Sequence, residues 1–157
     1  MTLIEIAKFL CQNKVMKLKI KRDEGVKDLP LPSYGRVGDA ALDIVASEDM
    51  IVPAKQKAII GTGVSFEIPE GQVGLVWDRS GMSFKHGQTV LGGVIDSNYR
   101  GELKVCLFNT TDDDYSVSRG DKIAQMVIQP APQYEVIEVD ELSETNRGEA
   151  GFGSSGK

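Results

Sequence analysis

The chain has 157 residues, a formal net charge of -5 and a single histidine. This length suits one domain that buries roughly two-thirds of its unfolded surface, and the acidic charge argues against a protein that coats nucleic acid through a broad basic face. A small anion such as a triphosphate is still allowed, because it needs only a few placed cations. One histidine and two distant cysteines, Cys11 and Cys106, give no metal site of zinc-type spacing.

Targeting signals point to the inside of the cell. No run of about 18 apolar residues is present, and Glu5 stands where a signal peptide would be basic. We therefore expect a soluble protein with reduced thiols, located in the cytoplasm, with no membrane and no nucleic acid as partner.

Residues 1–15 predict the one helix of the chain. In TLIEIAKFLCQNK one helical face is apolar and carries Leu3, Ile6, Ala7, Leu10 and Cys11. Thr2 and Glu5 have the spacing of a capping box. Met16 begins MKLKIKRDEG and would make a natural chain start, so we expect residues 1–15 to be an extension.

Residues 16–140 have a β pattern throughout. Short segments rich in Val, Ile, Leu and Phe alternate with turn clusters such as IPEGQ, SGMS, SNYRG, TTDDD and SRGD. The strand-like segments are KLKIK, ALDIVAS, KAIIGTGVSFEI, GLVW, TVLGGVI, ELKVCLFN, KIAQMVIQ and YEVIEV. Eight or more short strands predict an all-β domain, as a sandwich, a barrel or a jelly roll.

Residues 141–157 lose this pattern. ELSETNRGEAGFGSSGK contains four glycines and no periodicity, which predicts a mobile C-terminal arm. Its last seven residues imitate a phosphate-binding P-loop, G-x-x-x-x-G-K, but no helix follows to supply the amide groups that a P-loop uses.

A candidate phosphate-binding turn follows the strand GQVGLVW. Arg79, Ser80 and Gly81 place a fixed cation, a hydroxyl and an accessible amide next to one another. The same residues would also make an ordinary polar turn.

A candidate acid-base group lies in GGVIDSNYRGELKV, which predicts a hairpin with Asp96 and Tyr99 near its tip. An acid at the mouth of an apolar pocket could serve as a general base, and Tyr99 could offer a flat face to a ring. The alternative is structural, with Asp96 capping the turn and Tyr99 packing across strands.

Two polar residues interrupt apolar runs. Gln125 in KIAQMVIQ would need a partner if buried, either a substrate or a neighbouring subunit, because a buried amide without a hydrogen bond is costly. Asp43 in ALDIVAS similarly needs a cation or a water network. His86, beside Lys85 in a turn, is interpreted as a surface or structural residue.

Five segments in one order resemble the five motifs of the trimeric deoxyuridine triphosphatases (dUTPases). They are GDAALDIVAS, DRSGMS, GGVIDSNYRGELKV, RGDKIAQM and RGEAGFGSSGK, of which the third and fifth are the most specific. The resemblance runs from about residue 16 to Lys157. It implies a jelly-roll-like β-barrel and a homotrimer whose active sites are shared between subunits. The implied reaction is hydrolysis of dUTP to dUMP and pyrophosphate, by water attack at the α-phosphorus with Mg²⁺ on the triphosphate.

The resemblance assigns roles within the hairpin. Asp96 would orient and deprotonate the attacking water, and Tyr99 would lie against the deoxyribose, where a ribose hydroxyl would clash. The uracil edge would be read at Gly93, Val94, Ile95 and the hairpin backbone out to Lys104. Fixed backbone donors and acceptors suit this task, because cytosine would leave buried groups unpaired.

The resemblance also assigns the phosphate contacts. Arg79, Ser80 and Gly81 would hold the phosphates with help from Gln125, while Asp43 would anchor either the water shell of the metal or hydrogen bonds of the site. The arm would close over the bound nucleotide. Its contacts would come from Arg147 on the γ-phosphate, Phe152 stacked on uracil, and Gly153 and Ser154 around the phosphate chain.

Two other functions are weighed against this one. A dCTP deaminase shares the implied fold and trimer, but it would want a pocket glutamate and a different C-terminus. A nucleotide-gated regulatory protein on the same scaffold would keep the motifs and use residues 1–15 as an extra surface. Two departures from the family pattern are Ala41, where many members have glycine, and Asn98, at a position that is often acidic.

Overall fold

The computed structural model describes residues 16–146 and Gly148. The predicted helix over residues 1–15 lies outside the described residues, as do four predicted site residues, Arg147, Phe152, Gly153 and Ser154.

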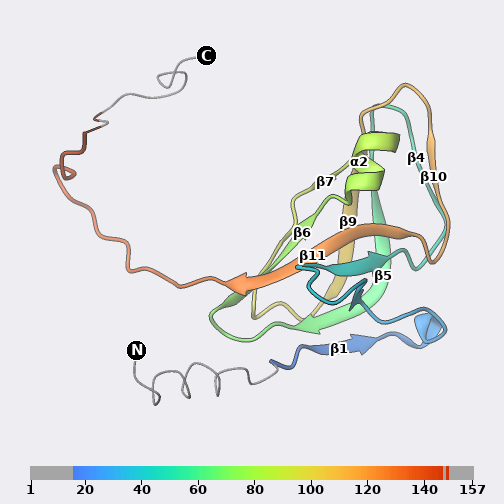
Figure 1. Cartoon of the computed structure of the whole chain (residues 1–157), viewed down its shortest axis with the longest axis horizontal. Coiled ribbons are helices and arrows are strands. Elements are labelled where there is room, and N and C mark those ends of the chain that lie inside the picture. The colour runs from blue at the N-terminus through green and yellow to red at the C-terminus, as the bar shows by residue number, and fades with distance from the viewer. Residues whose placement is uncertain (1–15, 147, 149–157) are drawn as a thin grey trace.

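Two antiparallel sheets form the body of the protein (Figure 1). The four-stranded sheet has the order β1 (Lys19–Arg22), β5 (Lys57–Glu67), β9 (Glu102–Asn109) and β7 (Gln88–Leu91). The five-stranded sheet has the order β2 (Ser33–Tyr34), β3 (Leu42–Val45), β11 (Lys122–Pro130), β6 (Gln72–Trp77) and β8 (Val94–Ile95).

Three smaller elements complete the described chain. A two-stranded ribbon joins β4 (Met50–Val52) to β10 (Tyr115–Val117), a 3-10 turn η1 spans Glu24–Val26, and a short helix α2 spans Ser80–His86. The prediction of an all-β, jelly-roll-like domain is confirmed, although the two sheets do not close into a continuous barrel. The described residues contain no helix whose length and apolar character would let it span a bilayer.

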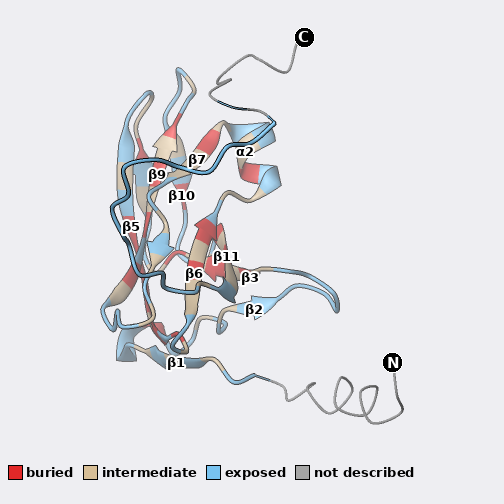
Figure 2. Cartoon of the chain, turned by 90° about the vertical axis from the view of Figure 1, so that its left-hand side faces the viewer, coloured by how far each residue is buried: buried red, intermediate tan, exposed pale blue. Residues whose placement is uncertain are grey.

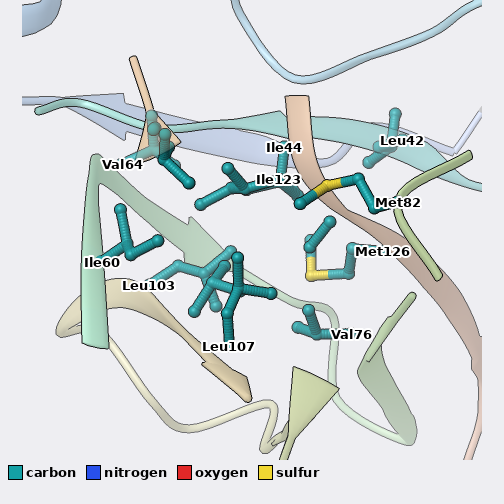
Figure 3. Packing of buried hydrophobic residues seen from close by; sticks show 14 of the residues in the cluster. Leu42, Ile44, Ile60, Val64, Val76, Met82, Leu103, Leu107, Ile123 and Met126 are labelled. Atoms are coloured by element: carbon teal, nitrogen blue, oxygen red, sulfur yellow. The ribbon is translucent and has the colours of Figure 1, made fainter. Parts of the chain in front are cut away.

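The core lies between the two sheets, where buried residues concentrate (Figure 2). Side chains alternate in and out along a strand, so every second residue faces the core. In β9 this places Leu103, Val105 and Leu107 inside, each 1% exposed. Figure 3 shows Leu103 and Leu107 packed together with residues of the opposite sheet. The residues it labels on that sheet are Leu42, Ile44, Val76, Ile123 and Met126.

Helix α2 replaces the polar turn that the sequence predicted at SGMS. Arg79 is still extended, with φ -87° and ψ 130°, and the helix starts at the next residue. Met82 is buried and attaches the helix to the core. Gly87 ends it in the left-handed conformation at φ 60°, where its N–H donates to the Ser83 carbonyl over 3.0 Å. One buried side chain and a glycine stop signal are enough to form this single turn.

The strand predicted at YEVIEV is wrong for this chain. The last bond of the sheet joins the Ala131 N–H to the Gly71 carbonyl at 2.8 Å, and residues 131–146 contain no strand. This segment runs away from the sheets (Figure 1). Tyr134, Val136 and Ile137 are 82%, 94% and 70% exposed. Alternating apolar residues form a strand only beside a free sheet edge, and the described chain offers this segment none.

A bulge in β5 sets the start of β9. The pairing register between the two strands shifts between Gly61 and Ser65. Within the bulge the Glu102 carboxylate accepts the N–H groups of Thr62 at 3.1 Å and Gly63 at 2.9 Å. Gly63 has φ +64°, and a Cβ there would lie 2.6 Å from a methyl carbon of Val26. Glycine is therefore required for both conformation and space.

We predict that Gly63→Ala lowers the free energy of unfolding by about 3 kcal/mol, because the left-handed conformation costs about 1–2 kcal/mol and overpacking a similar amount. Urea unfolding of the two proteins measures the difference. The matched control is Gly71→Ala, which has φ +74° but nothing within 4 Å of the new Cβ. An equal loss in both variants would contradict the crowding against Val26.

Candidate active site

The predicted site residues that the structure describes fall into two groups at different places. The first group surrounds a hollow of about 800 Å³, here called the anion hollow. Its polar residues come from β3, from the β6–α2 junction and from β11. They are Asp43, Arg79, Ser80, Gly81, Lys122 and Gln125.

Strand register brings the residues of the anion hollow together. Gln125 of β11 pairs with Asp43 of β3 on one side and with Trp77 of β6 on the other. The neighbours of Gln125 along its strand, Ala124 and Met126, are fully buried. Because side chains alternate, Gln125 and Asp43 must lie on the outer face of the sheet. The two interruptions in the apolar pattern are thus a shared polar face.

Asp43 is held between two cations. Its Oδ1 lies 3.1 Å from Arg79 Nε and its Oδ2 lies 2.6 Å from Lys122 Nζ, and its side chain is only 19% exposed. Arg79 Nη1 also donates to the main-chain carbonyl of Lys122 at 3.3 Å. The guanidinium is therefore oriented from two sides, and the need of Asp43 for a cation is met within the chain.

Gln125 has a partner within its own chain. Its Nε2 donates to the Asp78 carbonyl at 2.7 Å, which ties β11 to the residue that precedes Arg79. The contact supports the phosphate-binding turn from below. The partner that the sequence left open between a substrate and a neighbouring subunit is, for this donor, neither.

Asp78 organises the turn, and the sequence did not indicate it. Its carboxylate accepts the Val90 N–H at 2.5 Å and the hydroxyls of Thr89 and Ser83 at 3.0 Å each. One side chain thereby joins the end of β6 to α2 and to β7. The sequence signal was an acid directly before Arg79, which is indistinguishable from an ordinary turn residue.

The second group forms a pocket of about 310 Å³ on the β8–β9 hairpin, here called the hairpin pocket. Gly93 enters it with φ +102°, and its carbonyl accepts the Val76 N–H at 2.8 Å. A Cβ at Gly93 would lie 2.7 Å from the Val76 carbonyl, so only glycine fits. The lining residues are Val94, Ile95, Asp96, Tyr99, Glu102, Leu103 and Lys104.

The tip of the hairpin is fixed by local bonds. The Tyr99 N–H donates to the Asp96 carbonyl at 3.1 Å, and the Tyr99 hydroxyl donates to the Glu102 carbonyl at 3.0 Å. Glu102 in turn binds the β5 bulge through its carboxylate and lies 3.7 Å from Lys104 Nζ. Asp96 is exposed at the rim. The pocket thus combines an apolar wall, a flat ring and an accessible carboxylate.

The two groups lie at opposite ends of β6. Ile95 pairs with Gly74 near the start of that strand, whereas Arg79 follows its last residue, Trp77. At about 3.3 Å per residue, Asp96 and Arg79 are roughly 20 Å apart along the strand. A general base must lie within hydrogen-bond reach of the water that it activates. Within one chain the two groups therefore do not meet at one reacting bond.

Other charged groups of the chain have different tasks. Two bonds of 2.8 Å from the Arg119 guanidinium hold the pKa of Asp28 down at about 2, and neither residue lines the hollow or the pocket. Within the described ranges there is no cluster of three or more His, Cys, Asp or Glu side chains that could hold a metal ion. A metal here would therefore take most of its ligands from substrate and water.

Comparisons with known proteins agree with this layout. The dUTPase family model matches residues 27–156. Deoxyuridine 5'-triphosphate nucleotidohydrolase of Nautilia profundicola is 46% identical over 144 residues, covering 90% of this chain and 100% of the relative. The enzyme of the same name from Paramecium bursaria Chlorella virus 1 is 45% identical over 131 residues, covering 83% and 93%.

Solved structures give the same result. The Staphylococcus bacteriophage 80alpha dUTPase with dUPNHPP superposes with a TM-score of 0.83 at 32% identity, covering 90% of this chain and 99% of that one. The chain belongs to the dUTPase family.

Proposed function

We infer that the protein hydrolyses dUTP to dUMP and pyrophosphate. The observation that carries this is the pair of half-sites, one shaped for a ring beside a carboxylate and one shaped for phosphates, on a chain of the dUTPase family. The reaction keeps uracil out of DNA and supplies dUMP for thymidylate synthesis. We place it in the cytoplasm, with the free nucleotide pool.

The hairpin pocket binds the nucleoside. Its backbone between Gly93 and Ile95 is fixed by pairing with β6, so its donors and acceptors meet the uracil edge without rearranging. Tyr99, held by the Glu102 carbonyl, lies against the deoxyribose and leaves no space for a 2′-hydroxyl. A site built to hydrogen-bond one base rejects a base with the reversed pattern by roughly 10⁴-fold or more.

Asp96 activates the nucleophile. Its carboxylate orients a water molecule and accepts a proton from it while the water oxygen bonds to the α-phosphorus. The bond from the α-phosphorus to the bridging oxygen breaks, and that oxygen leaves with pyrophosphate. The products are dUMP and pyrophosphate, with the proton left on Asp96.

The anion hollow binds the phosphate chain. Arg79 supplies a fixed cation, Ser80 a hydroxyl and Gly81 a bare backbone, while Gln125 holds the turn through the Asp78 carbonyl. Charge-assisted bonds of this kind are about twice as strong as neutral ones.

We propose Mg²⁺ as the cofactor. The hollow suits an ion that enters on the triphosphate, because Asp43 already has two cationic partners and is free for indirect contact at most. When bound, such an ion neutralises charge on the pyrophosphate leaving group. A Mg(II) ion is named for the related dUTPase of phage phi11 of S. aureus.

The active unit we propose is a homotrimer with shared sites. The half-sites of one chain lie roughly 20 Å apart along β6, so the hairpin pocket of one copy has to meet the anion hollow of another. The domain of residues 16–140 would supply both, and the arm of residues 141–157 would reach a further copy. The segment before the arm supports this, because Tyr134 and Val136 are 82% and 94% exposed and suit burial against a neighbour.

The arm completes the site in this proposal. Phe152 stacks on uracil, Arg147 meets the γ-phosphate, and Gly153 and Ser154 wrap the phosphate chain. These residues lie outside the described part of the structure, so the assignment comes from the match of their motif to the family, whose model extends to residue 156.

The first test is pyrophosphate release from dUTP, dCTP, dTTP and UTP with Mg²⁺. We expect turnover of dUTP alone, and a loss of about 10²–10⁴-fold in Asp96→Asn, because an amide cannot accept the proton. Asp112→Asn, in an exposed loop, is the control and should behave as wild type. Comparable dTTP hydrolysis, or ammonia released from dCTP, would contradict the proposal.

The second test removes residues 147–157. We predict that the shortened protein keeps its assembly mass by light scattering and its thermal unfolding transition. Turnover of dUTP should fall by at least about 10²-fold, because the stacking and phosphate contacts of the arm are gone. Unchanged turnover would show that the arm takes no part in the reaction.

A further inference from the structure

The charges around the anion hollow nearly cancel. The described side chains that line it include three cations, Arg36, Arg79 and Lys122, and two carboxylates, Asp39 and Asp43. The local balance is therefore one positive charge, on a chain whose overall charge is -5. Removing Lys122 alone would leave the hollow with no net positive charge to attract phosphate.

Lys122 and Arg79 bind different oxygens of the same carboxylate. Lys122 Nζ lies 2.6 Å from Oδ2 of Asp43, and Arg79 Nε lies 3.1 Å from Oδ1. The shorter contact belongs to Lys122, so this residue takes the larger share of the carboxylate charge. Asp43 is 19% exposed, and water therefore screens it only in part.

Arg79 keeps most of its donors for other partners. A guanidinium has five N–H groups, and the bonds given within the described chain use Nε for Asp43 and Nη1 for the Lys122 carbonyl. Without the lysine ammonium, Asp43 would have Arg79 as its one close cation. A guanidinium and a carboxylate then favour a two-bond, fork-to-fork pair. Such a pair would turn the guanidinium from the hollow toward Asp43.

We propose that Lys122 is a positioning residue that neutralises Asp43, so that Arg79 retains its charge and donors for the phosphates. The proposal rests on the proposed function in one respect, that the triphosphate occupies the anion hollow. It gives Lys122 a role through Asp43 and Arg79 rather than through contact with substrate.

A direct phosphate contact by Lys122 makes a different prediction. In both cases loss of the lysine weakens phosphate binding. Only under charge balancing does the removal of Asp43 restore binding to a protein that lacks Lys122, because the local charge then returns to one positive. Under direct contact the second substitution recovers nothing.

The experiment measures the dissociation constant of inorganic tripolyphosphate by calorimetry, with the full-length protein in its native assembly. We expect Lys122→Met to weaken binding by about tenfold, the size expected for one charge-assisted contact. The Asp43→Asn, Lys122→Met double variant should recover most of that loss, and Lys122→Arg should bind nearly as wild type.

Parallel kinetics separate positioning from general damage. For Lys122→Met the KM for dUTP should rise by about tenfold while kcat changes by less than about threefold, because the hollow acts on the phosphates and Asp96 is distant. Lys122→Gln is a second variant in case the methionine disturbs folding, and thermal unfolding checks both. Lys57→Met, an exposed lysine that also begins a strand, is the matched control and should match wild type.

Three results would overturn the inference. They are a double variant as weak as Lys122→Met, a Lys122→Met protein that binds tripolyphosphate as tightly as wild type, and a wild-type protein that does not bind it. Failure of the proposed function is a separate result, since wild type would then release no pyrophosphate from dUTP whatever its affinity for tripolyphosphate.

Discussion

The pairing of β6 with β11 determines where both halves of the site lie. Six residue pairs join Gln72–Trp77 to Gln125–Pro130, and β3 and β8 are aligned against these two strands. A slip of one residue would turn Gln125 into the core and Met126 out to solvent, because side chains alternate along a strand. The burial of Met126, at 0% exposure, therefore also holds Gln125 under the phosphate-binding turn. Core packing and site geometry depend on one register.

Two carboxylates hold the functional loops to this frame. Asp78 accepts three hydrogen bonds that join β6, α2 and β7, and Glu102 accepts two from the β5 bulge while its carbonyl receives the Tyr99 hydroxyl. Hydrogen bonds to charged groups contribute about 1.5–3 kcal/mol each. The turn that presents Arg79 and the hairpin that presents Asp96 are in this way attached to strands rather than left as free loops, which is what a preorganised site requires.

The sequence predicted those parts of the structure that depend on local periodicity. The alternation in ELKVCLFN correctly placed Leu103, Val105 and Leu107 inside β9, and the resemblance of five motifs identified the family. Periodicity failed for YEVIEV, because a strand also needs an edge to pair with. It failed for α2 as well, because a seven-residue helix anchored by Met82 has no repeat to detect.

The supporting charges were beyond the reach of the sequence for a related reason. Lys122 is a lysine at the start of a strand, as is Lys57, and their difference is the Asp43 carboxylate contributed by another strand. Only the three-strand register reveals which charges meet. The same register places Asp96 roughly 20 Å from Arg79, so the base and the phosphate-binding cation of one chain serve different sites. Because an isolated copy holds only half of each site, hydrolysis in the proposed mechanism begins only with assembly, and folding, association and catalysis all depend on the same pairing of β6 with β11.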